Sequence, residues 1–229
     1  EGEKGKEKEV EEKKIPEKQK ICNEILSTEQ TYVESLSLCI EVWIDPLEGA
    51  IKRGRPIISP DEIKVVFASL KSITMFHKVL LSDIEKRTQQ WTEATCIADI
   101  FLDFLHYLKV YKLYVQNYPE SMRLLSSLRK NNPPFQAFYD ECMQNPALQR
   151  QALSSFLIMP VQRIPRYSML LSDLLKHTKE EHEDFPKLKE AVGRLGEVAT
   201  MLDEKMEEAH QFKKVMTLAD SLYWPDLSL

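Results

Sequence analysis

Apolar residues recur at steps of three and four along most of the chain, the spacing of one buried face of an α-helix. The first run extends from Lys18 to about Gly49, where Pro46 and Gly49 predict its end. A second run opens with Ser59-Pro60-Asp61-Glu62, which combines a helix N-cap, a proline at the first helical position and a glutamate three residues after the cap. This pattern predicts a helix that continues to the region between Arg87 and Trp91.

The same periodicity predicts further helices in the rest of the chain. One begins near Thr95 and is closed or bent at Pro119, and the others cover residues 122–128, 135–142, 153–176 and 185–211. A helix of that last length measures about 40 Å at ~1.5 Å per residue. Because no sustained alternating pattern is present, we predict an all-α fold built as an elongated multi-helix bundle.

Composition narrows the classes of function. Hydrophobic residues make up 43% of the 229 positions and charged residues 29%, as in a soluble globular protein, and the net charge of −5 does not point to a nucleic-acid partner. No apolar run reaches the length of a membrane span. The four cysteines and five histidines have no metal-ligand spacing, and no glycine-rich phosphate loop or nucleophile motif occurs. We therefore expect no cofactor, no metal, no catalytic residue for covalent chemistry and no nucleic-acid partner.

Charge and periodicity divide the chain into three segments. Residues 1–17 are mostly glutamate and lysine and predict a charged extension, residues 18–212 carry the helical pattern, and residues 213–229 form a tail or linker. Since no initiator methionine is present, we expect the chain to be a piece of a longer protein.

The stretch 153–176 is unusual for a buried helix because it contains two prolines, Pro160 and Pro165, beside Gln162, Arg163 and Arg166. One interpretation is a kinked core helix whose arginines pair with buried carboxylates. The other is a functional surface. The residues alone leave both interpretations open.

Two motifs carry a resemblance to a known family. Pro160-Val161-Gln162-Arg163-Ile164-Pro165-Arg166-Tyr167, followed by Met169-Leu170-Leu171, resembles the third conserved region of the Dbl-homology domain. Ile25-Leu26-Ser27-Thr28-Glu29-Gln30-Thr31-Tyr32-Val33 resembles the first region of the same family. The resemblance covers roughly residues 18–211. It implies a guanine-nucleotide exchange factor that accelerates GDP release from a Rho-family small GTPase, of Rho, Rac or cell-division-cycle type, without covalent chemistry.

The resemblance also implies which residues contact the GTPase. Glu29 would contact the first switch segment and Arg166 the second, while Asp203 takes the place of the family's asparagine and so departs from its pattern. Ser155, Ile158 and Gln162 share a helical face with Arg166 at steps of three, four and four. We expect Glu29 and Arg166 on one solvent-exposed surface with Asp203 close to both.

Because Arg163 lies off that face, we expect it to form an internal hydrogen-bonded pair.

Two alternatives remain at this point. One is a non-catalytic scaffold with the same fold, for which Asp203 is the main argument. The other is a membrane-surface module that uses Lys52, Arg53 and Arg55, which the acidic net charge disfavours. We expect a cytoplasmic protein that is recruited to a membrane in its full-length form. A pleckstrin-homology domain usually follows in the family, and a complete one does not fit in this chain.

Overall fold

The computed structural model describes residues 15–222, with side chains described for 15–204, 206 and 207. Within this range the chain forms helices joined by turns and contains no strand, which confirms the all-α prediction. The α-helices are α1 (Glu17–Cys39), α2 (Asp45–Lys52), α3 (Pro60–Phe67), α4 (Leu70–Thr88), α5 (Ala98–Phe104), α6 (Leu108–Asn131), α7 (Pro133–Met143), α8 (Leu153–Leu157), α9 (Met159–Lys176) and α10 (Phe185–Leu222). A π-helical turn, η1 (Ile40–Ile44), and two 3₁₀ turns, η2 (Leu105–Tyr107) and η3 (Pro146–Leu148), connect some of them.

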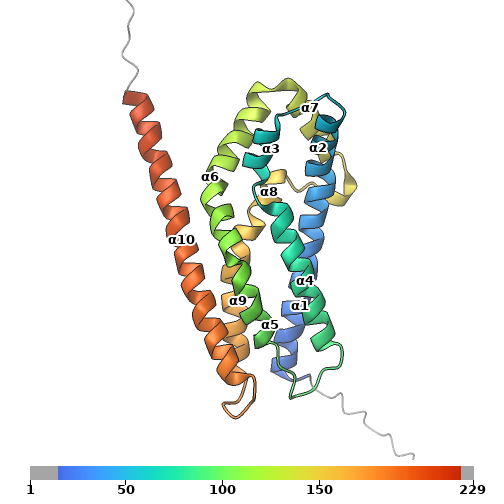
Figure 1. The fold of residues 1–229 in the computed structure, drawn as a ribbon, viewed down its shortest axis with the longest axis vertical. Helices are drawn as coiled ribbons and strands as arrows, with labels where there is room; N and C mark the ends of the chain where they lie inside the picture. The colour runs from blue at the N-terminus through green and yellow to red at the C-terminus, as the bar shows by residue number, and fades with distance from the viewer. Residues whose placement is uncertain (1–14, 223–229) are drawn as a thin grey trace, which may run out of the picture.

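The long helices run along a common direction, so the molecule is an elongated bundle (Figure 1). α1 packs against α4 and α9, α3 packs against α6, and α10 packs along one side against α9, α6 and α5. The core between them contains large aromatic side chains with no exposed area, including Trp43, Tyr111, Tyr167 and Phe101. Elements that lie far apart in the sequence, above all α1 and α9, therefore lie side by side.

Two prolines that predicted helix ends do not end helices. Pro46 lies in the first turn of α2, where a helix tolerates proline, and the π-helical turn before it carries α1 on into α2. Pro119 lies inside α6, so the separate helix predicted for 122–128 is the second half of α6. The first run, predicted from Lys18 to about Gly49, is thus helical through Pro46 to Lys52, whereas the prediction of a separate helix at 122–128 was wrong.

The helix predicted from residue 60 starts where the pattern indicated but divides in two. The Glu62 amide donates to Ser59 Oγ at 3.2 Å and the Ser59 amide donates to Glu62 Oε2 at 2.7 Å, which completes the capping box. Ala68 then adopts a left-handed backbone with φ of 43°, and α3 and α4 meet at an angle of 46°. No single helix in the described residues is long and apolar enough to span a membrane, and only this bent pair meets such a test jointly, by length and composition alone.

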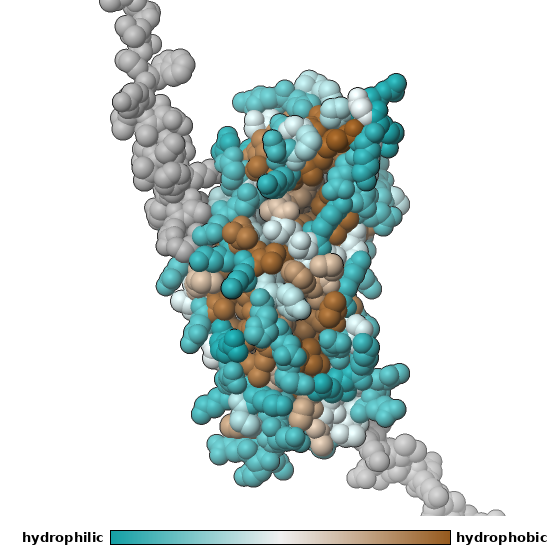
Figure 2. Space-filling model, in the orientation of Figure 1, coloured by the Kyte–Doolittle hydropathy of each residue, from teal (hydrophilic) through white to brown (hydrophobic). Residues whose placement is uncertain are grey.

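Hydrophilic residues cover most of the face formed by α4 and α6, with apolar groups between them (Figure 2). The most exposed large apolar side chains of the described chain include Met75, Val79, Leu113 and Met169. The first three lie on α4 and α6, whereas Met169 lies on α9.

Candidate functional site

Glu29 lies inside the bundle with none of its surface exposed, so the expectation that it lies on a solvent-exposed surface was wrong. Its place in the helical repeat explains this: Ile25, Glu29, Tyr32 and Leu36 follow one another at steps of four, three and four, and all four are buried. In this structure the Glu29 side chain has no surface with which to contact a GTPase.

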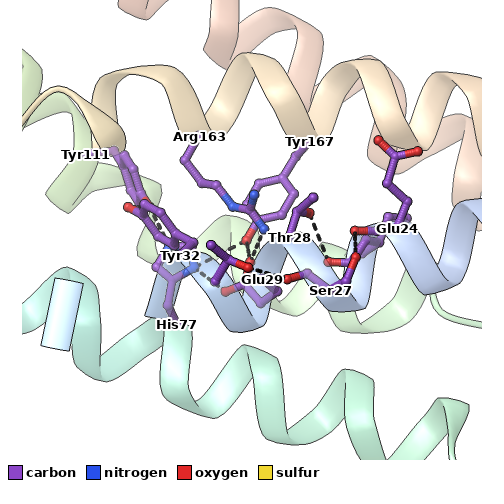
Figure 3. A network of polar contacts seen from close by, with 11 residues as sticks. Glu24, Ser27, Thr28, Glu29, Tyr32, His77, Tyr111, Arg163 and Tyr167 are labelled. Carbon is purple, nitrogen blue, oxygen red and sulfur yellow. Dashed lines mark hydrogen bonds and ion pairs between the residues drawn. The ribbon is translucent and has the colours of Figure 1, made fainter. Parts of the chain in front are cut away.

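Glu29 instead joins three helices through its two carboxylate oxygens (Figure 3). His77 of α4 places its Nδ1 2.6 Å from Glu29 Oε1. Arg163 and Tyr167 of α9 both donate hydrogen bonds to Oε2. The prediction that Arg163 forms an internal pair is confirmed.

The network continues to α6 through tyrosine hydroxyls. Tyr111 is hydrogen-bonded to His77 Nε2, and the hydroxyls of Tyr111 and Tyr32 lie 3.1 Å apart. Burial raises the pKa of both tyrosines well above the ordinary value, so they are neutral hydrogen-bonding groups. Sequence reasoning did not single out Tyr111, His77 or Tyr167 as members of the Glu29 network.

The network holds a buried ion pair. Burial alone would raise the pKa of Glu29, but His77, Arg163 and Tyr167 outweigh it and lower that pKa below its ordinary value. Burial alone would lower the pKa of Arg163, and Tyr167 and Glu29 outweigh it and raise that pKa. Glu29 and Arg163 are therefore both charged at neutral pH, and they fix α1 against α9 from within.

The exposed carboxylate that α1 presents beside α9 belongs to Glu24, five residues before Glu29. Glu24 Oε1 lies 2.5 Å from an Arg166 terminal nitrogen, and the two side chains are 48% and 42% exposed. Figure 3 shows Glu24 apart from the buried network, along the same helix. Sequence reasoning missed Glu24, although the polar positions Glu24, Thr28, Thr31 and Ser35 follow the same helical spacing on a different face.

The residues predicted to share a face with Arg166 lie on α8 and α9. Ser155 and Gln162 are exposed and Ile158 is half-buried. The Ile158 amide donates to the Ser154 carbonyl at 3.1 Å and the Gln162 amide to the Ile158 carbonyl at 3.2 Å. Helical hydrogen bonding thus continues across the short break between α8 and α9, and Pro165 lies within α9 without ending it.

Asp203 is exposed on α10, the helix that packs along α9. Among the described residues no hydrogen bond or ion pair links Asp203 to Arg166 or Glu24. The predicted closeness of Asp203 to Glu29 and Arg166 stays a prediction.

We call the surface over α1, α8 and α9 the α1–α9 surface and define it by Glu24, Ser155, Ile158, Gln162 and Arg166. Asp203 is exposed on the neighbouring helix α10. An exposed ion pair such as Glu24–Arg166 contributes about 0–1 kcal/mol, so a partner's charged groups can replace it at little cost. Beneath this surface, the Glu29 network fixes α1 against α9. Where side chains are described, no group of three possible metal ligands is found. The geometry suits recognition of a protein surface.

Comparisons of the sequence and of the structure with known proteins point to the same family. The sequence pattern described as "RhoGEF domain" matches residues 21–203. Protein ECT2 of Mus musculus is 35% identical over 206 residues, which cover 88% of this chain and 23% of that protein. "Guanine exchange factor for Rac 30" of Dictyostelium discoideum is 34% identical over 203 residues, covering 88% of this chain and 12% of that protein. The crystal structure of the DH domain of FARP2 superposes with a TM-score of 0.73 at 27% identity, over 94% of this chain and all of that one. The chain thus spans a quarter or less of the length of these curated relatives.

Proposed function

Because the chain belongs to the RhoGEF domain family, we propose that it accelerates GDP release from a Rho-family small GTPase. Support comes from the family match over most of the helical part of the chain and from relatives of which one is named as an exchange factor for Rac. Because the matched relatives are several times longer, recruitment of the full-length protein to a membrane through a domain outside this chain is part of the proposal.

The proposed mechanism needs no covalent step. A GTPase holds its nucleotide through phosphate and Mg²⁺ contacts that two switch segments organise. A partner that binds the nucleotide-free conformer more tightly than the loaded one weakens nucleotide binding by the same factor, because linkage is reciprocal. A rigid surface with a few charged groups facing the switch segments is enough to favour the nucleotide-free conformer.

The observation that carries this proposal is the exposed Glu24–Arg166 pair above the buried Glu29–Arg163 pair. The inner pair fixes α1 and α9 relative to each other, while the outer pair offers one carboxylate and one guanidinium to a partner. We propose that Glu24, in place of Glu29, and Arg166 contact the switch segments. Gln162, Ile158, Ser155 and Asp203 extend the contact along α8, α9 and α10.

Nucleotide-release assays on Rho, Rac and cell-division-cycle type GTPases test this proposal. The unmodified chain should accelerate GDP release from at least one of them. Glu24→Ala and Arg166→Ala should each slow catalysed release more than tenfold, because truncating one partner of an interfacial charge contact costs about 2–5 kcal/mol. Their melting curves should stay close to that of the unmodified chain, since both residues are exposed.

The matched control is Arg123→Ala. Arg123 and Glu120 form an exposed pair of the same length, 2.5 Å, on α6, and neither residue belongs to the α1–α9 surface. This variant should exchange at the original rate. Binding of a GTPase without accelerated release from any member of the panel would contradict the proposal and identify a non-catalytic scaffold.

A further inference from the structure

A cavity of about 540 Å³ opens between α6, α7 and the segment that leads into α8. Part of its wall is apolar: Leu125 and Tyr139 are buried, and Met122 and Ala152 are half-buried. None of these side chains belongs to the α1–α9 surface. A ligand that fills the cavity therefore needs an apolar portion to cover this wall.

Arg129 lies at this cavity in a fixed orientation. Its guanidinium carbon stacks 4.0 Å from the centre of the Tyr139 ring, and its Nε donates to Gln136 Oε1 at 3.2 Å. Both contacts leave the two terminal nitrogens unengaged: across the described side chains, neither has a hydrogen bond or ion pair with the protein. A guanidinium held in this way presents several donors in a planar fork.

The other polar residues around the cavity add donors and no negative charge. Lys130, Ser126 and Ser154 line it, and no aspartate or glutamate does. A second cavity of about 470 Å³, between η1, α2 and α7, provides a contrast within the same molecule. There Arg53 lines the cavity together with two carboxylates, Glu41 and Glu141. Of these two cavities, only the first is lined by cations without a carboxylate.

We propose that the Arg129 cavity binds a phosphomonoester carried on an aromatic group, as in the phosphotyrosine side chain of a partner peptide. A phosphate has three terminal oxygens and a charge near −2, which matches the Arg129 fork, the Lys130 ammonium and two hydroxyls together. A carboxylate would engage only the fork. The aromatic ring would cover Leu125 and Met122. This site is independent of nucleotide exchange.

A lipid headgroup carries related chemistry but suits the site less well. Membrane docking beside a phosphate site is strengthened by exposed apolar side chains that enter the bilayer. The large apolar residues that are most exposed in the described chain, such as Met75, Leu113 and Met169, do not line the cavity. The apolar groups of the cavity lie in its wall instead.

Titration of the chain with N-acetyl-phosphotyrosine amide, followed by the methyl NMR signals of Met122 and Leu125, tests the proposal. We expect saturable shifts of both signals, with binding at least tenfold tighter than that of inorganic phosphate or N-acetyl-tyrosine amide. Arg129→Met should weaken binding at least tenfold, because it removes the fork and keeps an apolar stem. Ser126→Asp should weaken it similarly, because it places a negative charge at the cavity.

Arg53→Met is the matched control and should bind as the unmodified chain does. Equal binding of inorganic phosphate, or equal effects of Arg53→Met and Arg129→Met, would overturn the proposal. Arg129-dependent binding to phosphatidylcholine vesicles that contain phosphatidic acid, without binding of the phosphotyrosine probe, would also overturn it in favour of a lipid.

Discussion

Glu24 and Glu29 lie five residues apart on α1, and at the residue scale their surroundings give them opposite roles. Glu29 is wholly buried and bonded to His77 and Arg163, whereas Glu24 is about half exposed and pairs with Arg166 at the surface. Loss of Glu29 should therefore affect folding, and loss of Glu24 should affect binding.

Glu29→Gln should lower the free energy of unfolding at pH 7 by about 3 kcal/mol or more, because Arg163 then lacks its buried counter-charge. The pH dependence should change as well. Since the folded pKa of Glu29 is depressed, its contribution is present above its unfolded pKa of about 4.3 and is lost as pH falls through the folded pKa. Urea unfolding from pH 7 down to 3 should show this loss in the unmodified chain and less of it in Glu29→Gln.

Glu34→Gln on the same helix is the control, since Glu34 is exposed, and it should change stability by less than about 0.5 kcal/mol. If Glu29→Gln were as stable as Glu34→Gln at pH 7, the buried pair would not hold α1 to α9.

The motif singled out Glu29, which the structure places in the core and not at the surface. A motif match compares residue types, while exposure depends on the phase of the helical repeat. That phase was visible in the sequence, because Glu29 falls in step with Ile25, Tyr32 and Leu36. His77, which contacts Glu29, and Tyr111, which contacts His77, were not predictable in the same way, because they come from other helices.

At the scale of elements, the periodicity of apolar residues predicted the helices. It predicted the junctions between helices only in part. The capping box at Ser59 is local and was read correctly. The break at Ala68 and the π-helical turn before Pro46 depend on packing against neighbouring helices, and no local residue signals them. Asp184 was also missed: its segment reads as a charged link, yet it is 1% exposed.

Asp184 should contribute to stability by capping another helix. Its carboxylate accepts hydrogen bonds from the amides of Ile97 at 2.9 Å and Ala98 at 3.2 Å, at the start of α5. Asp184→Ala leaves these buried amides unpaired and should cost about 1–2 kcal/mol in thermal or urea unfolding. Asp83→Ala, at an exposed intrahelical pair on α4, should cost less than about 0.5 kcal/mol. Equal costs for the two variants would show that Asp184 does not cap α5.

At the scale of the whole molecule, the bundle brings α1, α9 and α10 together although more than a hundred residues separate the first from the others. The all-α bundle was predicted, and so was the exposure of Arg166 on α9. The composition of the surface was predicted incompletely, because which side chains face outward depends on how the helices pack. The central claim is that Glu24 and Arg166 act on a GTPase, and not merely on each other.

A charge-swap cycle tests that claim most directly, with catalysed GDP release measured for Glu24→Arg, Arg166→Glu and the double variant. The double variant restores an internal ion pair with reversed polarity, so all three proteins should melt close to the unmodified chain. If both residues contact the GTPase, release by the double variant should stay more than tenfold slower, like that of each single variant. Recovery of the original rate in the double variant would contradict the account, because it would mean that the pair matters only within the bundle.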